Sequence, residues 1–422
     1  MVLPFFTISD LSLEGRTVLM RVDINSPINP ETGEILSLKR INEHASSIKK
    51  LPPCKLVLLA HQSRPGKKDY YPLKEHARVL SKVLDRDVVY IPSLFHERAV
   101  EAIKEMKVGD IILLENSRFY AEEVALSDTS LDVQERTHIV RSLSKVSDIY
   151  VNDAFSAVHR SQPTLVGFTR VLPSCAGPVM EKELMALSRV TDDPESPCVA
   201  ILGGLKVDDS INVAEHLLEN GICDTILTTG VVGSMFQWAD GYDLGTVNVN
   251  FIRQEIKGAD ELIERCESIL ENHRDKIHYP GDMALNIEGK RVRITLEELP
   301  AKGPIYDIDI ETIAKYSSII QKARTIIANG PSGVYEVPEF SDGTVEIFRA
   351  INGSSAYSVM GGGETTAVIK DMRFTDIDHV STGGGALINY LSGKEMPVLT
   401  ALKRSKELFM DSELVIPSSR RN

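Results

Sequence analysis

Short apolar runs alternate with amphipathic stretches along nearly the whole length of this 422-residue chain. In the first half, five runs predict strands: 16–24, 54–61, 87–93, 110–116 and 148–155. Four stretches between them have helical periodicity: 38–51, 73–84, 97–106 and 133–146. The second half repeats the rhythm with apolar runs at 198–204, 225–230, 324–330, 356–363 and 379–385. Near-continuous apolar strands separated by helices are typical of parallel sheets covered on both faces, so we predict an α/β fold with two doubly wound parallel-sheet domains.

The alternation breaks at residues 171–197, where a helix-like segment stands between turns rich in Pro and Gly. We place the domain boundary there, which gives an N-terminal domain over 1–175 and a C-terminal domain over 176–395. Residues 281–303 predict a small β excursion inside the second domain. The remaining tail, 396–422, is polar and basic, and we expect either a frayed end or a segment that packs on the N-terminal domain.

Composition narrows the class of protein. The formal net charge of −13 argues against non-specific nucleic-acid binding, which needs an excess of Lys and Arg along one face. The five cysteines are dispersed without a C-x-x-C spacing, which favours a reducing compartment. No apolar run approaches a membrane span, and "MVLPFF" is too short for a signal sequence. We therefore expect a soluble cytoplasmic protein with no nucleic-acid or membrane partner.

Basic and polar side chains follow the predicted strands of the first half. Ligands of open α/β sheets bind beyond the carboxyl ends of strands. The residues at these ends are Asp23, Asn25, His61, Arg64, Arg118, His159 and Arg160, and Arg40 begins a helix after a turn. Arginine pairs bidentately with phosphate or carboxylate, so the set predicts a site for a small polyanion. Taken singly, each arginine is better explained as a solvated or salt-bridged surface group; their shared position argues for a joint role.

The strand ends of the second half have glycine instead. The segments are Gly203–Gly204, Gly230, Asn329–Gly330, Gly361–Gly363 and Gly383–Gly385. Backbone N–H groups in such loops, with the helix N-termini behind them, suit a polyphosphate. Lys206 could reach a phosphate there, and Glu364 could hold Mg²⁺. Any single run is equally explained as a tight turn. The P-loop and dinucleotide fingerprints are absent, so the residues by themselves predict an anion-binding, two-domain α/β protein.

Seven segments in order resemble the phosphoglycerate kinase family: "RVDIN", "HQSRP", "LLENSRFYAEE", "YVNDAFSAVHR", "AILGGLKV", "NGPSGVYEVPEF" and "HVSTGGGALINYLSGKEMP". They span residues 16 to 402, and "GGLKVDDS" resembles the archaeal branch. The resemblance implies a domain that binds phosphoglycerate, a domain that binds the nucleotide, and a hinge between them. It also implies reversible phosphoryl transfer between 1,3-bisphosphoglycerate and MgADP, giving 3-phosphoglycerate and MgATP. A monomer is expected, with a dimer as the alternative.

The resemblance also implies roles for particular residues. The expected phosphoglycerate ligands are Asp23, Ile24, Asn25, Arg40, His61, Gln62, Ser63, Arg64, Arg118 and Arg160. The expected nucleotide ligands are Lys206, Glu336, Gly362, Gly363, Glu364 and Thr365, with Glu364 also at the Mg²⁺. Arg40, Lys206, Gly384 and Gly385 would act on the phosphoryl group in transfer. Both reacting oxygens are acidic, so the reaction needs alignment and charge stabilisation rather than a general base.

Four positions depart from the commoner family pattern, and all lie in the nucleotide half: Ser210, Thr229, Asp309 and Glu364. They leave the reaction class unchanged but put nucleotide affinity and base preference in doubt. Two alternatives therefore stay open, a kinase that uses another nucleoside triphosphate and a non-catalytic sensor that has kept the fold. A scaffold role has only the tail in its favour.

Overall fold

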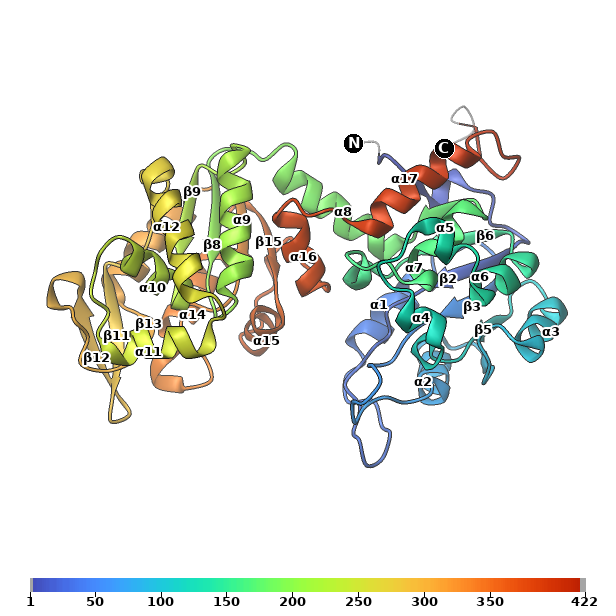
Figure 1. Cartoon of the computed structure of the whole chain (residues 1–422), viewed down its shortest axis with the longest axis horizontal. Helices are drawn as coiled ribbons and strands as arrows, with labels where there is room; N and C mark the ends of the chain where they lie inside the picture. Colours follow the sequence, from blue (N-terminus) through green and yellow to red (C-terminus); the bar gives the residue numbers. More distant parts are fainter. Residues whose placement is uncertain (1–2, 418–422) are drawn as a thin grey trace. The chain divides into compact units, whose positions relative to one another are not determined.

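The computed structural model describes residues 3–417 and divides into two compact units (Figure 1). Unit 1 comprises the chain up to Leu184 together with the segment that begins at Glu395, and unit 2 comprises Met185–Lys394. The chain passes from unit 1 to unit 2 inside helix α8 (Pro178–Thr191) and returns after Lys394. The division therefore lies later than the predicted boundary at 175–176, which falls inside strand β7 (Ser174–Ala176) of the first sheet.

Unit 1 is built on a seven-stranded, wholly parallel sheet. The other strands are β1 (Phe6–Thr7), β2 (Thr17–Arg21), β3 (Lys55–Leu59), β4 (Val88–Tyr90), β5 (Ile111–Leu113) and β6 (Ile149–Asn152). Their order is β1-β7-β6-β2-β3-β5-β4, which places β2 at the centre. The short strands β1 and β7 have no apolar run long enough to predict them, and they extend the sheet beyond β6 through the pairs Phe6↔Cys175 and Tyr150↔Ser174.

Side chains of the unit 1 strands alternate between two apolar layers. On β2, Val18 and Met20 pack in one layer and Leu19 packs in the other. The helices of unit 1 are α1 (Lys39–Ile48), α2 (Lys74–Leu84), α3 (Glu97–Glu105), α4 (Ala121–Ala125), α5 (Leu131–Gln134), α6 (His138–Leu143), α7 (Pro163–Val166) and α17 (Pro397–Phe409). Helices α1 and α2 supply the first layer, and α3 and α6 supply the second. Burial on both faces explains why the strands read as continuous apolar runs.

Two helical segments differ from the sequence-based expectation. The helix predicted over 133–146 is split into α5 and α6, because Thr137 adopts an extended backbone and its hydroxyl accepts from Val140 N at 3.3 Å. In the C-terminal tail, α17 packs against α7 and β7, and Ser405 Oγ accepts from Ser174 N at 3.1 Å. Most of the tail is thus an ordered part of unit 1, and residues 418–422 lie outside the described range.

Unit 2 contains a second parallel sheet and a small antiparallel one. The parallel sheet has the order β10-β9-β8-β14-β15-β16. Its strands are β8 (Cys198–Leu202), β9 (Thr225–Thr228), β10 (Ile277–His278), β14 (Thr325–Asn329), β15 (Tyr357–Gly361) and β16 (His379–Val380). The predicted β excursion is a three-stranded sheet of β11 (Asp282–Ile287), β12 (Lys290–Thr295) and β13 (Ile305–Ile308).

The helices of unit 2 flank its parallel sheet (Figure 1). They are α9 (Val207–Glu219), α10 (Gly230–Ala239), α11 (Thr246–Glu255), α12 (Ala259–His273), α13 (Ile310–Ile320), α14 (Asp342–Asn352), α15 (Gly363–Asp371) and α16 (Gly384–Leu391). Tyr316 on α13 and Phe348 on α14 pack with Ile326 of β14 in one apolar core. The prediction of two doubly wound parallel-sheet domains is confirmed. Among the described residues, no helix combines the length and apolarity needed to cross a membrane.

Candidate functional site

A cavity of about 700 Å³ in unit 1 lies beyond the carboxyl ends of β2, β3, β5 and β6. Eight residues predicted from the sequence line it: Asp23, Asn25, Arg40, His61, Ser63, Arg64, Arg118 and Arg160. They come from loops that are far apart in the chain, and the parallel register of the strands brings them to one edge of the sheet. The predicted clustering of these side chains is therefore what the fold produces.

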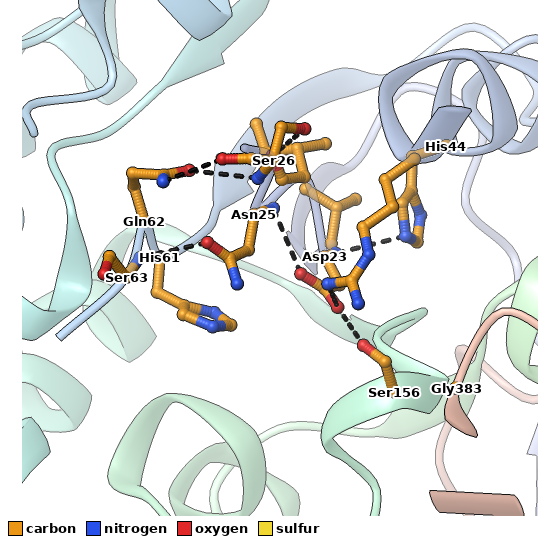
Figure 2. A network of polar contacts seen from close by, with 12 residues as sticks. Asp23, Asn25, Ser26, His44, His61, Gln62, Ser63, Ser156 and Gly383 are labelled. Atoms are coloured by element: carbon orange, nitrogen blue, oxygen red, sulfur yellow. Dashed lines mark hydrogen bonds and ion pairs between the residues drawn. The ribbon is translucent and has the colours of Figure 1, made fainter. Parts of the chain in front are cut away.

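Asp23 is the centre of the hydrogen-bond network at this edge (Figure 2). Its carboxylate accepts from the backbone N–H of Asn25 at 3.1 Å, from Arg40 Nη1 and from Ser156 Oγ. Its own backbone N–H donates to His44 Nε2 at 3.1 Å. Three donors to the buried carboxylate and one contact of its backbone fix Asp23, which holds the guanidinium of Arg40 at the cavity wall, where it can meet an anion.

The histidine behind Asp23 connects the cavity to the helix that joins the units. His44 Nδ1 lies 2.9 Å from Asp153 Oδ2, and both side chains are buried. Because His44 Nε2 accepts from Asp23, the proton sits on Nδ1 and is donated to Asp153. Asp153 Oδ1 in turn accepts from the backbone N–H of Val179 at 2.7 Å and of Met180 at 3.3 Å, which caps the first turn of α8.

His61 is held as a neutral hydrogen-bond donor. Its Nδ1 lies 2.9 Å from Arg21 Nη2, which can only donate, so Nδ1 accepts and the proton is on Nε2. Burial lowers the pKa of His61 well below its usual range, and the cations of Arg21 and Arg118 lower it further. An imidazole that stays neutral near pH 7 can donate one hydrogen bond to an anionic oxygen without adding another charge.

Two arginines in the cavity lack carboxylate partners among the described residues. Arg118 donates to the carbonyl of Ser63, and Arg160 Nε donates to His159 Nε2 at 3.3 Å. Burial, then the neighbouring Arg160, lowers the pKa of Arg118 to about 10, and burial also lowers the pKa of Arg160. Both remain cationic at pH 7, so the cavity concentrates positive charge that a bound polyanion would neutralise.

Ser63 supplies backbone that the surrounding network keeps in a strained conformation. Its φ of 56° lies in the left-handed region, which a serine rarely adopts. Its N–H donates to Asn25 Oδ1 at 3.0 Å, its hydroxyl donates to Asp69, and its carbonyl accepts from Arg118. Strain held by several contacts at a cavity wall is typical of a functional loop.

Two predicted ligands do not line the cavity, and several residues that do were missed. Ile24 is buried in the apolar core, and the Gln62 amide bonds to Ser26 and to His76 Nε2 at 3.0 Å. Both sit between cavity residues in sequence, and the alternation of extended backbone turns them to the opposite side. The missed lining residues with polar side chains are Lys67, Asp69, Glu123, Ser127, Ser156 and Gln162. Only Ser156 has a sequence signal, since it follows a predicted strand.

The glycines of unit 2 form a cradle of closely packed backbone at the carboxyl edge of its sheet. Gly330 has a φ of +87°, and a Cβ there would lie 2.2 Å from the carbonyl oxygen of Gly203. A Cβ on Gly230 would lie 3.1 Å from the backbone N of Gly204, and one on Gly384 would lie 3.3 Å from Gly362 Cα. These positions need glycine for close approach of one loop to another, as the sequence pattern indicates.

Helices begin at this cradle. Lys206 precedes the first residue of α9, Gly230 begins α10, Gly362 precedes α15 and Gly383 precedes α16. Helix N-termini present N–H groups and partial positive charge, which suits a phosphate chain. The Lys206 side chain is exposed next to this edge. The cradle therefore combines backbone donors with the exposed cation of Lys206.

A cleft of about 410 Å³ adjoins the cradle and contains Glu336 and Glu364 in its lining. Thr365, predicted as a ligand, is buried, and its hydroxyl accepts from Gly330 N at 3.0 Å, so it holds the cradle in shape. Asn329 Oδ1 is buried without a partner and lies 2.9 Å from the Cβ position of Gly362. An unpartnered carbonyl oxygen next to an exposed carboxylate fits a site for Mg²⁺ bound mainly by phosphate and water oxygens.

Protein side chains alone form no complete metal site in the described part of the chain. No group of three or more His, Cys, Asp or Glu residues there is arranged to hold a metal ion. A magnesium ion that arrives with the phosphates of a nucleotide needs only one or two protein oxygens, so this finding agrees with the chemistry of the cradle.

The positions that depart from the family pattern have structural roles. Asp309 caps helix α13 by accepting from Ile310 N at 2.7 Å, and it pairs with Arg291 at 3.1 Å. Thr229 is buried, and its Oγ1 lies 2.4 Å from the Cβ position of Gly203. Ser210 is buried on α9 with an unpartnered hydroxyl. None of these three lines the cleft, so they alter its supports, whereas the fourth departure, Glu364, is part of its wall.

Comparison with known proteins gives one consistent result. The family model described as "Phosphoglycerate kinase" matches residues 8–394. The phosphoglycerate kinase of Thermoplasma acidophilum is 46% identical over 406 residues, which cover 96% of this chain and 99% of the relative. That of Methanobacterium bryantii is 48% identical over 409 residues, with the same coverage of 96% and 99%.

Solved structures agree with these relatives. The phosphoglycerate kinase of Pyrococcus horikoshii has a TM-score of 0.86 and 44% identity, covering 96% of this chain and 100% of that one. The enzyme of Coxiella burnetii has a TM-score of 0.81 and 30% identity, covering 95% and 99%. Similarity extends over both units and includes the residues at both edges, and the chain therefore belongs to the phosphoglycerate kinase family.

Proposed function

We propose that this chain performs the reaction of its family, with phosphoglycerate bound in unit 1 and the nucleotide bound in unit 2. The acyl phosphate of 1,3-bisphosphoglycerate passes reversibly to ADP and yields 3-phosphoglycerate and ATP. The observation that carries the proposal is the cavity of unit 1, in which half-buried cations without carboxylate partners among the described residues gather at one sheet edge. A substrate with a phosphate at one end and a carboxylate at the other supplies the missing negative charge.

Within unit 1, we assign the two ends of the substrate to different side chains. Arg64, Arg118 and Arg160, with the Nε2–H of His61, bind the non-transferred phosphate. Arg40 meets the acyl phosphate and balances charge on its equatorial oxygens, since its guanidinium donates to Asp23, which Ser156 holds in turn by donating to the same carboxylate. Gln62, Ile24 and Ser63 act through the backbone shape of the loops that hold these groups.

Within unit 2, the glycine cradle binds the phosphates of the nucleotide. The phosphate chain meets the ammonium of Lys206 and the backbone N–H groups of Gly362, Gly363, Gly384 and Gly385. The ribose meets Glu336 in the cleft. Glu364 and Asn329 are the protein oxygens that would hold Mg²⁺. When bound, the metal neutralises part of the phosphate charge.

The chemistry requires no proton to be removed, because the attacking oxygen is a carboxylate or a nucleotide phosphate. Catalysis then comes from alignment of the two oxygens and from fixed positive charge around the phosphoryl group. Arg40 and Lys206 supply that charge from side chains, and the backbone N–H groups of residues 383–385 supply it from the main chain. The hinge motion expected from the resemblance remains a prediction.

The proposed setting is a monomer in the cytoplasm. All five cysteines are free thiols in buried positions, which supports a reducing compartment. Light scattering coupled to size-exclusion chromatography tests the oligomeric state, and a stable dimer would contradict the monomer.

Consumption of ATP by the purified chain tests the reaction. The assay contains 3-phosphoglycerate and Mg²⁺, and the acyl phosphate formed is coupled to NADH oxidation. We expect turnover that disappears when 3-phosphoglycerate is omitted. A folded chain that shows no turnover with ATP or GTP, but binds either substrate, would favour the sensor hypothesis instead.

A further inference from the structure

Two of the five cysteines of the chain face each other inside unit 2. Cys198 is the first residue of β8, and Cys223 stands two residues before β9. Their sulfur atoms are 3.4 Å apart, and both side chains are buried. At this distance the two thiols share a hydrogen bond, and an approach of about 1.4 Å would bring the sulfurs to the length of a disulfide bond.

The backbone holds the two thiols next to each other. Strands β8 and β9 are parallel, with Val199 opposite Thr225. Asp224, which directly follows Cys223, accepts from Cys198 N at 2.7 Å through Oδ2 and donates its own N–H to the Cys198 carbonyl at 2.9 Å. Neighbouring strands lie about 4.8 Å apart, within the range of about 4.4–6.8 Å that the Cα atoms of a disulfide span. The sulfurs can therefore join by side-chain rotation, with both strands left in place.

The remaining cysteines provide the contrast. Cys54 and Cys175 belong to unit 1, and Cys266 lies on α12 of unit 2. All three are buried, and in the described part of the chain none of them has another cysteine sulfur within hydrogen-bonding distance. Burial raises the pKa of Cys54 to about 11 and that of Cys266 to about 12. These thiols are protonated and isolated, whereas Cys198 and Cys223 have each other.

The pair lies at the amino edge of the parallel sheet, because both cysteines stand at the start of their strands. The glycine cradle lies at the opposite edge, beyond Leu202 and Thr228, where the same strands end. Residues 195–197 and 219–221, which come shortly before the two cysteines, are exposed. Strand ends next to exposed segments open more readily than strand centres. A small oxidant can therefore reach the pair through a local opening that leaves the cradle in place.

We propose that Cys198 and Cys223 are a redox-active dithiol that hydrogen peroxide converts to an intramolecular disulfide, which clamps β8 to β9. One sulfur attacks the peroxide O–O bond and becomes a sulfenic acid, and water leaves. The second sulfur then forms the S–S bond and displaces the hydroxyl, which leaves as water with the proton of the second thiol. Two thiols and one peroxide thus give one disulfide and two waters, and the thiols lose two electrons and two protons.

The surroundings of the pair determine how fast it reacts and what the product does. The hydrogen bond with Cys198, and then burial, raises the pKa of Cys223 well above its usual range. Because only the thiolate attacks peroxide, the closed fold reacts slowly, and oxidation proceeds through the local opening. The disulfide closes a loop between positions 25 apart and restricts the unfolded chain, so it stabilises unit 2. In a reducing compartment without peroxide the pair stays a dithiol. The inference is independent of the proposed phosphoryl transfer.

The first test maps the thiols of the wild-type chain. The native protein is treated with hydrogen peroxide, its free thiols are blocked with iodoacetamide in denaturant, and its peptides are analysed by mass spectrometry without reduction. We expect a cross-linked peptide pair that joins Cys198 to Cys223 and disappears after treatment with dithiothreitol. Cys54, Cys175 and Cys266 should carry the blocking group.

The second test measures the effect of the cross-link on stability. Urea unfolding followed by the fluorescence of Trp238 on α10, the one tryptophan of the chain, reports on unit 2. We expect oxidation to raise the urea midpoint by about 1 M, and dithiothreitol to reverse this shift. Cys223→Ala should lose both the cross-link and the shift. Cys266→Ala, the matched control at another buried cysteine of unit 2, should keep both. If Cys223→Ala fails to fold, the peptide map of the wild-type chain still decides the question.

Three outcomes would overturn the inference. If all five thiols are still blocked by iodoacetamide after peroxide treatment, the pair does not oxidise in the native chain. If Cys198 or Cys223 is recovered as a sulfinic acid without a cross-link, the two sulfurs do not join. If the cross-link forms but the urea midpoint is unchanged, the disulfide does not clamp β8 to β9.

Discussion

The proposed anion sites of the two units are built from different parts of the chain. In unit 1 the site consists of side chains, and its arginines are positioned by buried carboxylates and histidines. In unit 2 the site consists mainly of backbone, and glycines let four loops approach closely enough to present N–H groups. A site made of side chains should lose activity when a side chain is truncated. A site made of backbone should lose binding when a side chain is added to a glycine.

The largest expected effect is on turnover, from removal of a charged side chain. Arg40→Ala or Lys206→Ala should lower kcat by about two to three orders of magnitude, since each removes one donor to the phosphoryl group. Steady-state kinetics with 3-phosphoglycerate and MgATP measure this loss. Arg78→Ala, which removes an exposed ion pair with Glu75, serves as the control and should change kcat little. Turnover within a few-fold of wild type in both variants would contradict the proposed roles.

Addition of one methyl group should break the unit 2 cradle. Gly330→Ala places a Cβ 2.2 Å from the carbonyl oxygen of Gly203 at a φ of +87°, so we expect a loss of about 3 kcal/mol in unfolding free energy and weaker binding of MgADP. Gly281→Ala is the matched control, because no atom lies within 4 Å of its Cβ position. Urea unfolding followed by Trp238 fluorescence reports on unit 2. A fully stable Gly330→Ala variant would show that the cradle tolerates a side chain.

A smaller effect is expected from the histidine behind the unit 1 cavity. His44→Ala leaves the buried Asp153 carboxylate without its ring partner, and we expect a loss of about 2–3 kcal/mol in unfolding free energy. His138→Ala, at an exposed pair with Glu122, should cost less than about 0.5 kcal/mol. Urea unfolding followed by far-ultraviolet circular dichroism measures both. Equal stability of the two variants would mean that the buried pair contributes no more than a surface one.

The sequence predicted the parts of this architecture that follow local rules. Apolar runs located the strands from β2 to β6, and the rule for strand carboxyl ends predicted that Asp23, Arg118 and Arg160 share one site, as they do in the cavity. Gln62, which only the family resemblance implied as a ligand, lies between cavity residues but faces the other way because extended backbone alternates. Adjacency in a motif is thus weaker evidence than position in the strand.

Contacts between distant segments could not be predicted in this way. His44 and Asp153 are 109 positions apart, and no spacing rule links a helical histidine to an aspartate after a strand. Cys198 and Cys223 are in contact although they are 25 positions apart and share no motif spacing. The sequence of helix α17 is that of a polar tail, and its apolar face is recognisable only from its packing against α7 and β7. Tertiary packing decides these features, and the sequence reports it only indirectly.

The smallest expected effects are on the pH dependence of stability, where one buried group in each unit acts in the opposite direction. In unit 1, burial lowers the pKa of His76 to about 4, and its Nε2 donates to Gln62 Oε1. In unit 2, burial raises the pKa of Asp307 to about 6 although Gly343 N–H and Arg291 donate to it.

The sign follows from which state takes up the proton first. As the pH falls below about 6.5, His76 is protonated in the unfolded chain before the folded one, so its contribution to stability is lost toward pH 4. Asp307 is protonated in the folded chain first, so its contribution is present at low pH and lost as the pH rises through about 6. Between pH 8 and pH 5 the two groups should therefore shift the unfolding free energy in opposite directions, by on the order of 1 kcal/mol each.

Differences between wild type and single variants isolate each group from the other titrations of the chain. The stability advantage of wild type over His76→Gln should shrink between pH 7 and pH 5, whereas that over Asp307→Asn should grow over the same interval. Urea unfolding at pH 5, 6, 7 and 8 measures both differences. If neither stability difference changed with pH, both groups would have ordinary pKa values in the folded chain. Opposite slopes would show that the side-chain site of unit 1 and the sheet beneath the cleft of unit 2 respond to acid in opposite ways, as their buried groups require.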